Sequence, residues 1–449
     1  MEKCSYHFIG IGGIGMSGLA RIALQKGDKV SGSDACSSAV TQALQKEGAH
    51  IFIGHNATHV QENCQVVYST GVSSDNSEMQ EAQRKNLSII HRSQFLAQLM
   101  EGSYPLLVTG THGKTTTSSL LAHMLVFLGE DPSYSIGGIV QGFKSNGGFG
   151  KGKWFVAEAD ESDRSFLAYT PHGAILTNIG IDHLNYWDSE ENLVKGFYTF
   201  YEKVQNKDLL FWCADDERLV SLNLKGTGYG FSEKADLRIE KVEYLGWKSV
   251  FNLKWNGKEY LGLEIPMIGA HSVLNATAVI GLCLKLGFEE GKIKEGLSRF
   301  SGVQRRVEKK GEAEGITVYD DYGHHPTEIA STLQAIKKAC EGSRIIVVFQ
   351  PHRYTRTRDC FMDFAPALQK ADVVVLTDIY SAGESAIEHV DSGRLLDTFE
   401  KQHSSYYIPQ KDLLDKVLGL IKPGDVLVSM GAGDITKIGP QILERLSSR

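Results

Sequence analysis

The chain has 449 residues, which exceeds the usual size of a single domain and predicts two or three domains. A hydrophobic fraction of 42% with 47 glycines is typical of α/β domains. The formal net charge of −7, with no block of lysines and arginines, argues against nucleic acid as a partner.

The seven cysteines are scattered, and no two of them form a C-x-x-C pair. Neither a zinc site nor a disulfide framework is indicated, so we expect reduced thiols in a cytoplasmic protein. The apolar run from Tyr6 to Leu19 is interrupted by glycines and lacks a basic segment before it. We therefore expect no signal peptide and no membrane insertion.

The first predicted domain, residues 1–102, begins with a strand, a glycine-rich turn and a helix. The run Phe8 to Gly15 contains G-x-G-x-x-G, and Asp34 ends the next strand about twenty residues on, where its carboxylate could bind a ribose hydroxyl. The pattern predicts a Rossmann-like site for a diphosphate and a ribose. A nicotinamide cofactor and a UDP sugar satisfy it equally, and the glycines could also serve only a tight turn.

The second predicted domain, residues 103–302, begins with a phosphate-binding loop. An apolar strand at 106–108 leads into Gly110-Thr111-His112-Gly113-Lys114-Thr115-Thr116. An amphipathic helix follows the loop and ends at Gly129. Such a turn points backbone N–H groups and the positive end of the helix dipole at one place, which suits a polyphosphate. Lys114 would add a positive charge, and the Thr115 hydroxyl is placed to ligate magnesium.

Carboxylates follow the next strand of this domain. Residues 154–158 read as a buried strand that ends on Glu158, and Asp160, Glu161 and Asp163 follow. Ligands of parallel sheets bind beyond the carboxyl ends of the strands, so Glu158 is a candidate metal ligand. His183, after the next strand, could bind a second cation or only cap a loop.

The pattern changes to short alternating strands from about 236 to 268. The turn 255–258, with Asn-Gly at its centre, predicts a type I′ hairpin, so we expect a small antiparallel flap. Residues 269–275 then enter a helix, where Asn275 could meet an adenine edge and Ser272 could simply cap the helix.

The third predicted domain, residues 303–449, alternates strands and helices again. Adjacent arginines, Arg305 and Arg306, lie at its start and could neutralise charge during phosphate transfer or simply face solvent. The predicted strands at 316–319, 345–349, 373–378 and 425–428 end in polar residues. Among those residues, Arg353 and Arg356 could bind a carboxylate in the bidentate geometry that a guanidinium allows and a lysine does not.

Taken in order, these motifs closely resemble those of the Mur ligases over essentially the whole chain. The resemblance rests on the following runs: Gly10 to Gly18 with Gly32-Ser33-Asp34, Gly110 to Thr115, Ala157 to Asp163, Thr177-Asn178-Ile179 with Asp182-His183, Arg305-Arg306, Asp320 to Glu328, and Gln350 to Arg356. It implies an α/β fold of three domains: a Rossmann-like UDP-binding domain, a central P-loop ATPase-like domain with a small antiparallel flap, and a C-terminal Rossmann-like domain.

The resemblance implies an ATP-dependent ligase of peptidoglycan precursor synthesis. ATP would phosphorylate the lactyl carboxylate of UDP-N-acetylmuramate, and the amine of L-alanine would displace phosphate from the acyl phosphate. The implied partners are these three small molecules with two Mg²⁺ ions, in a monomer or homodimer.

The same resemblance implies roles for individual residues. The catalytic group would be Lys114, His183, Arg305, Arg306, His324 and His325. ATP would contact Gly110, Thr111, His112, Gly113, Lys114, Thr115, Thr116 and Asn275, and the metal ligands would be Thr115, Glu158 and His183. The UDP sugar would contact Gly10, Gly12, Gly13, Gly15, Met16, Ser17, Asp34, Ser69 and Thr70, and the muramoyl and alanine groups would contact His352, Arg353 and Arg356.

Two departures and three alternatives accompany this interpretation. Relatives often have Asn where this chain has Ser272, and no lysine suited to carbamylation follows His183 at the expected distance, so carbamylation is not predicted. The nearest alternative is the recycling ligase that adds a preformed tripeptide, although the run 350–356 favours the alanine-adding type. A nicotinamide oxidoreductase or a nucleotide switch would leave most of the motifs without a role.

Overall fold

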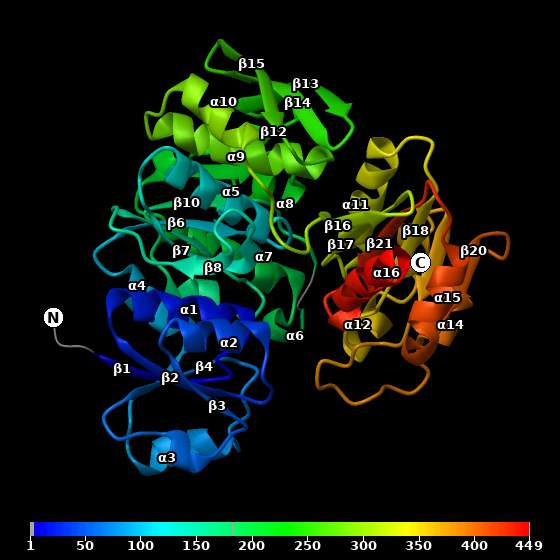
Figure 1. Ribbon diagram of the computed structural model, residues 1–449. Coiled ribbons are helices and arrows are strands. Elements are labelled where there is room, and N and C mark those ends of the chain that lie inside the picture. The colour runs from blue at the N-terminus through cyan, green and yellow to red at the C-terminus, as the bar shows by residue number, and fades with distance from the viewer. Residues whose placement is uncertain (1–3, 182–183, 449) are drawn as a thin grey trace. The chain divides into compact units, whose positions relative to one another are not determined.

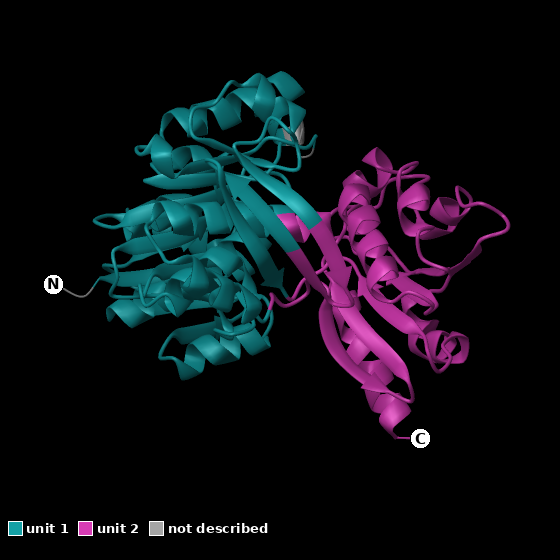
Figure 2. Ribbon diagram, turned by 90° about the horizontal axis from the view of Figure 1, so that it is seen from above, with its two compact units in different colours: residues 1–241, 251–265, 274–301 teal, residues 242–250, 266–273, 302–449 magenta. Residues whose placement is uncertain are grey.

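The computed structural model describes residues 4–181 and 184–448 (Figure 1). The chain forms two compact units (Figure 2): unit 1 contains residues 1–241, 251–265 and 274–301, and unit 2 contains residues 242–250, 266–273 and 302–449. These units do not coincide with three sequence domains, so the boundaries at 102 and 302 stay predictions. Within the described ranges, no helix is long and apolar enough to cross a lipid bilayer.

The first sheet of unit 1 has five parallel strands in the order β3-β2-β1-β4-β5, as the glycine pattern predicts for a Rossmann-like fold (Figure 1). The strands are β1 Ser5–Ile9, β2 Lys29–Asp34, β3 His50–Ile53, β4 Gln65–Tyr68 and β5 Ile89–His91. The helices are α1 Ile14–Lys26, α2 Ala39–Lys46, α3 Ser77–Arg84 and α4 Arg92–Met100, with a 3-10 turn η1 at Ala57–His59.

Both faces of this sheet are covered because side chains alternate along β1. Phe8 packs edge-on against Phe95 of α4, with ring centroids 5.4 Å apart. The next residue, Ile9, joins a buried cluster with Met79 of α3. The last three residues of the strand, His7 to Ile9, are therefore buried, as expected of a parallel strand that is covered on two sides.

The second sheet has ten strands in the order β15-β14-β13-β12-β11-β10-β6-β9-β7-β8, and all of it belongs to unit 1 except residues 242–250 of the β13–β14 hairpin. Its strands are β6 Tyr104–Thr109, β7 Ser133–Val140, β8 Ser145–Gly148, β9 Trp154–Glu158, β10 Gly173–Leu176, β11 Leu210–Cys213, β12 Thr227–Gly230, β13 Leu237–Leu245, β14 Lys248–Trp255 and β15 Lys258–Ile265. The helices are α5 Lys114–Phe127, α6 Leu184–Trp187, α7 Glu190–Glu202, α8 Glu217–Ser221, α9 Ala270–Lys285 and α10 Glu290–Ser298; 3-10 turns lie at Ser165–Ala168 and Lys207–Leu209.

The predicted flap is part of this second sheet. Two residues join β13 to β14 and β14 to β15, a connection that only antiparallel neighbours allow. At the second turn Asn256 and Gly257 have φ of 50° and 76°, as the predicted type I′ turn requires. Because β13 pairs parallel with β12, the flap strands extend the main sheet instead of forming a separate layer.

The sheet of unit 2 has six strands in the order β16-β17-β21-β18-β19-β20, all parallel except the β16–β17 pair. The strands are β16 Glu308–Ala313, β17 Ile316–Asp321, β18 Ile345–Phe349, β19 Val373–Leu376, β20 Ser404–Tyr407 and β21 Val426–Met430. The helices are α11 Pro326–Ala339, α12 Tyr354–Asp359, α13 Phe364–Leu368, α14 Ser392–Leu396, α15 Leu413–Leu420 and α16 Ile438–Ser447; 3-10 turns lie at Gln410–Asp412 and Asp434–Lys437.

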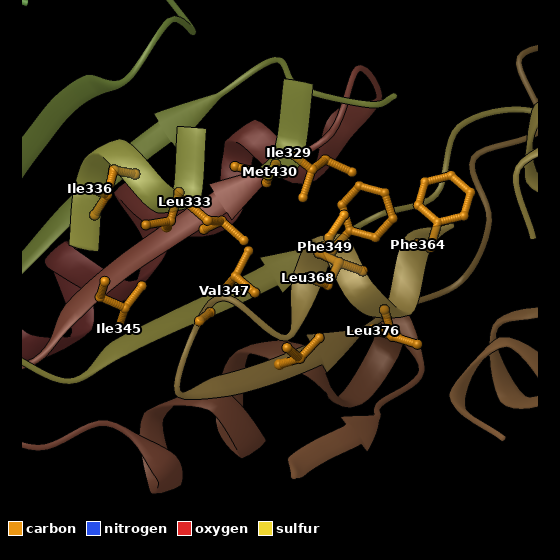
Figure 3. Packing of buried hydrophobic residues seen from close by; sticks show 14 of the residues in the cluster. Ile329, Leu333, Ile336, Ile345, Val347, Phe349, Phe364, Leu368, Leu376 and Met430 are labelled. Atoms are coloured by element: carbon orange, nitrogen blue, oxygen red, sulfur yellow. The ribbon is translucent and has the colours of Figure 1, made fainter. Parts of the chain in front are cut away.

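Strand β18 lies at the centre of the unit 2 core. Val347 and Phe349 point into a cluster with residues of α11 and α13, among them Leu333 and Phe364 (Figure 3). The intervening Val348 belongs to the cluster on the opposite face, which includes residues of α15 and α16. The sheet is therefore buried on both faces, which explains why every residue of β18 is apolar.

Phe349→Ala should destabilise unit 2 by about 3–5 kcal/mol, since a fully buried phenyl ring would be replaced by a cavity. Urea unfolding followed by a probe in unit 2 measures the loss. Met362→Ala is the matched control, because Met362 is 70% exposed and should change stability little. Equal effects from the two substitutions would contradict this account of the core.

Candidate active site

The phosphate loop between β6 and α5 has a conformation that depends on two glycines. Gly110 has φ of 136°, and a Cβ there would lie 2.0 Å from Oγ1 of Thr177. Gly113 has φ of 84°, and a Cβ there would lie 2.8 Å from Oδ1 of Asn275. Any side chain at either position would clash as well as strain the backbone. The second clash also shows that Asn275, the predicted adenine contact, lies beside the loop.

Residues that follow β10 hold the loop in shape. Asn178 Oδ1 accepts a hydrogen bond from the backbone N–H of His112 at 2.9 Å, and Thr177 Oγ1 donates to the His112 carbonyl at 2.7 Å. Thr111 Oγ1 donates to the Gly180 carbonyl at 3.2 Å. The loop is therefore braced from the neighbouring strand before any ligand arrives.

Lys114 is held in a buried network of charges at this loop. Its Nζ donates to the carbonyls of Gly110 at 2.6 Å and Thr111 at 3.1 Å, and it lies 2.7 Å from Glu161 Oε2. Burial opposes the charged amine, but the negative charges of Glu161 and Asp160 outweigh it and raise the pKa of Lys114. The lysine is therefore a fixed positive charge at the start of α5.

Glu161 is the acidic partner in this network, and the sequence interpretation gave it no role. Burial raises the pKa of its carboxyl to about 7, against the opposing charge of Lys114. Among the described residues its Oε1 has no hydrogen-bond partner. The spacing of the Glu158-to-Asp163 run placed several carboxylates together, but it did not say which of them would face the lysine.

Thr115 and Glu158, two of the predicted metal ligands, lie in contact with each other. Thr115 Oγ1 donates to Glu158 Oε1 at 2.9 Å, and the Gly137 N–H donates to the other carboxylate oxygen. Burial raises the pKa of Glu158. Hard oxygen donors of this kind suit Mg²⁺. The described residues contain no group of three or more His, Cys, Asp or Glu side chains arranged for a metal, and His183 lies outside the described residues.

The N-terminal glycine loop precedes α1, whose first turn has no side-chain cap. Gly10 has φ of 77°, and the Gly12 N–H donates to Asp34 Oδ2 at 2.8 Å, so Asp34 fixes the loop. Gly13 is the N-cap residue, and Gly15 lies in the first helical turn. The uncapped N–H groups there are free to bind an anion.

Four other predicted UDP-sugar contacts lie outside the glycine loop itself. Met16 and Ser17 are buried in α1, where the Ser17 hydroxyl donates to the Ile14 carbonyl at 3.1 Å. Ser69 and Thr70 follow β4, next to the end of β1 in the sheet. Their contact with a substrate stays a prediction.

A buried carboxylate behind this loop supports the end of β2. Glu78 of α3 accepts hydrogen bonds from Ser33 Oγ at 2.6 Å and from the Asn56 N–H at 3.1 Å. The rings of His7 and His59 lie 3.2 and 2.9 Å from its oxygens. Burial alone would raise the pKa of Glu78, but the bonds from His7, Ser33 and His59 lower it to about 2. The sequence gave no sign of this cluster, since its members are spread from residue 7 to residue 78.

In unit 2 the two adjacent arginines differ in their surroundings. Arg305 Nη2 donates to the carbonyls of Gly431 at 2.5 Å and Gly433 at 3.0 Å, and its Nε lies 3.5 Å from Asp320 Oδ2. Both guanidinium groups lie over the ring of Tyr322, 4.9 Å from its centroid for Arg305 and 5.2 Å for Arg306. Arg305 thus holds the loop after β21, which favours Arg306 as the arginine available to a substrate.

His324 and His352 lie close together, with ring centroids 6.0 Å apart. Burial lowers the pKa of His324 to about 4 and that of His352 to about 3, and the nearby positive charge of Arg356 adds to both shifts. His352 also stacks on Tyr380, and its buried Nδ1 has no hydrogen-bond partner among the described residues. Both rings are neutral at pH 7.

The remaining predicted residues of unit 2 lie around α11 and α12. His325 is the N-cap residue of α11 and approaches the Cys360 thiol at 3.8 Å. Arg353 has φ of 68° and lies 3.8 Å from Glu384, while Arg356 lies on α12. Glu384, which also accepts from Thr355, belongs to a loop with no recognisable pattern in the sequence.

A phosphate loop beside buried carboxylates, on one of three mainly parallel sheets, defines a nucleotide-using enzyme of the α/β class. Three family models match: Mur ligase family, catalytic domain at residues 5–104; Mur ligase middle domain at 108–283; and Mur ligase, glutamate ligase domain at 305–433. The chain belongs to the Mur ligase family.

Individual relatives narrow the comparison. The UDP-N-acetylmuramate–L-alanine ligase of Protochlamydia amoebophila is 45% identical, covering 99% of this chain and 98% of that one. The bifunctional enzyme MurC/Ddl of Chlamydia pneumoniae is 42% identical over 97% of this chain and 54% of its own length. The crystal structure of the UDP-N-acetylmuramate-alanine ligase of Thermotoga maritima has a TM-score of 0.87 at 32% identity, with 99% of each chain covered.

Glu78→Gln should destabilise the protein above pH 4.5, the ordinary pKa of the carboxyl, by an amount on the order of 3 kcal/mol. A folded-state pKa lowered to about 2 means that the ionised group stabilises the fold above 4.5 and that this stabilisation disappears as the pH falls toward 2. Urea unfolding of both proteins across this pH range measures the difference. The exposed Glu62→Gln is the control. A difference independent of pH would contradict the prediction.

Proposed function

We propose that this enzyme is an ATP-dependent ligase that joins L-alanine to the lactyl carboxylate of UDP-N-acetylmuramate and releases ADP and phosphate. The observation that carries the proposal is the braced phosphate loop, where Lys114 and the Thr115–Glu158 pair lie together in the same unit as the glycine loop. The names of relatives at 42–45% identity over nearly the whole chain support the choice of substrates.

The chemistry explains why an amide-forming enzyme would need a phosphate loop. A free carboxylate resists attack by an amine because its leaving group would be an oxide. Transfer of the ATP γ-phosphoryl group to the carboxylate gives an acyl phosphate, from which phosphate leaves readily. The amine of alanine attacks the acyl carbon, and the tetrahedral intermediate expels phosphate. Phosphoryl transfer of this kind needs alignment and charge neutralisation above all.

The residues of the loop suit those two needs. Lys114 would neutralise the β- and γ-phosphates, and the N–H groups at the start of α5 would orient them. Thr115 and Glu158 would hold a Mg²⁺ ion, which supplies further positive charge to the phosphate oxygens when bound. Asn275, whose side chain lies against Gly113, is placed for the nucleotide base.

The arginines of unit 2 suit the amino acid. Arg353 and Arg356 would bind the alanine carboxylate, since a guanidinium can hold both carboxylate oxygens at once. The unpartnered Nδ1 of His352 would offer a further hydrogen bond to the substrate. Fixing the carboxylate orients the amine, and orientation of this kind can lower a barrier by several kcal/mol, up to about 7–11 kcal/mol in the best cases.

The direct test is phosphate release with ATP, Mg²⁺ and UDP-N-acetylmuramate in the presence of L-alanine, glycine, L-serine or the tripeptide. L-alanine should give the highest kcat/KM. Glycine and serine should follow within about 10- to 200-fold, because one small group is worth only about 1–3 kcal/mol. Release with the tripeptide but not with alanine would instead establish the recycling reaction.

Lys114→Ala should lower kcat by about 100-fold or more, because it removes a charge that stabilises the transferring phosphoryl group. Binding of UDP-N-acetylmuramate, measured by calorimetry without ATP, should remain. Lys151→Ala, at an exposed lysine of the same unit, is the matched control. Full activity in the Lys114 variant would overturn the assignment of the loop.

A further inference from the structure

Arg92, the first residue of α4, connects the two loops of unit 1. Its Nη2 lies 3.1 Å from Asp163 Oδ2 and 3.6 Å from Asp160 Oδ2, on the loop that follows β9. Asp163 is itself fixed, because its other oxygen accepts a hydrogen bond from the Ser165 N–H at 3.0 Å. Residues that follow a strand of the central sheet therefore hold the guanidinium in one orientation. The backbone of Arg92 lies in α4, a helix of the N-terminal sheet region.

The other end of the guanidinium faces the glycine loop. Arg92 Nη1 lies 3.5 Å from the position that a Cβ of Gly15 would occupy, over the first turn of α1. Within the described part of the chain, Nη1 donates no hydrogen bond, while Nη2 is taken up by Asp163. One nitrogen of the guanidinium is therefore anchored, and the other lies beside Gly15, one of the predicted UDP-sugar contacts.

This placement brings two positive features together. The N-terminus of the 13-residue helix α1 carries a partial positive charge, and no side chain caps it. The Arg92 guanidinium lies at contact distance from that turn, so an anion bound there would meet both positive features. Asp160 and Asp163 hold Arg92 from behind and leave the side toward α1 to a ligand.

We propose that Arg92 is a substrate-positioning residue: Nη1 donates to a diphosphate oxygen of the UDP sugar bound at the glycine loop, while Asp163 anchors Nη2. The inference rests on the proposed function, since it takes its ligand from there. It adds a positively charged side chain to a predicted site that otherwise contains none. The alternative role is a purely structural clamp between the two sheets.

Calorimetry with UDP and with uridine separates these roles, because only UDP has the diphosphate. In R92A the Kd of UDP should rise by about 10- to 100-fold, the usual value of a hydrogen bond to a charged group, while the Kd of uridine stays the same. The KM for UDP-N-acetylmuramate should rise more than kcat falls. R84A is the matched control, since Arg84 pairs with Glu81 on the surface of the same domain.

R92K keeps the test valid if R92A does not fold. Lysine retains the charge, but its single ammonium group cannot replace both Nη1 and Nη2 and so cannot bond Asp163 and the ligand at the two places. R92K should therefore unfold at the temperature of the wild type and still bind UDP several-fold more weakly. D163N, which loosens the anchor, should weaken UDP binding in the same direction.

Two results would overturn the inference. Wild-type affinity for UDP in R92A and R92K, with a lower unfolding temperature, would establish the clamp and leave the proposed function intact. A wild-type protein that binds neither UDP nor UDP-N-acetylmuramate would overturn the inference and the proposed function together.

Discussion

The buried ion pair between Lys114 and Glu161 is the interaction on which the central site depends. A charged amine is costly to bury without a partner, and here Glu161 and two backbone carbonyls compensate it. The same arrangement keeps the amine at the start of α5, where a phosphate would bind. Glu161 thus occupies the place of an anion, and a bound polyphosphate would compete with it for the lysine. The glycines of the loop allow the backbone to come close enough for this.

The two nucleotide-type loops of unit 1 are stabilised by different means. Side chains from β10 brace the central loop by bonding its backbone directly. The N-terminal loop is held by Asp34, next to Ser33, which donates to the buried carboxylate of Glu78. In both cases polar groups of the protein satisfy the loop before a ligand arrives, so the binding surface is preformed and less ordering is required on binding.

The sequence predicted those parts of the fold and site that depend on local pattern. The strand–loop–helix around Lys114 was found because its glycines, lysine and apolar residues are adjacent, and the type I′ turn at 256–257 follows from two residues alone. Glu78, Glu384 and the Arg92–Asp163 pair were missed because their partners are far away in the chain. Arg305 and Arg306 were grouped by adjacency, and both lie over Tyr322, but adjacency could not show that Arg305 also bonds the loop after β21.

The neutrality of the histidines in unit 2 has a consequence for recognition. An imidazolium at His324 or His352 would repel the guanidinium of Arg356, and burial disfavours it further. The rings can therefore donate or accept hydrogen bonds without adding charge, and the positive charge for a substrate carboxylate would come from the arginines, which do not titrate near neutral pH. The affinity for the carboxylate of an amino acid would therefore change little with pH near neutrality. If the histidines supplied the positive charge, this affinity would depend on pH.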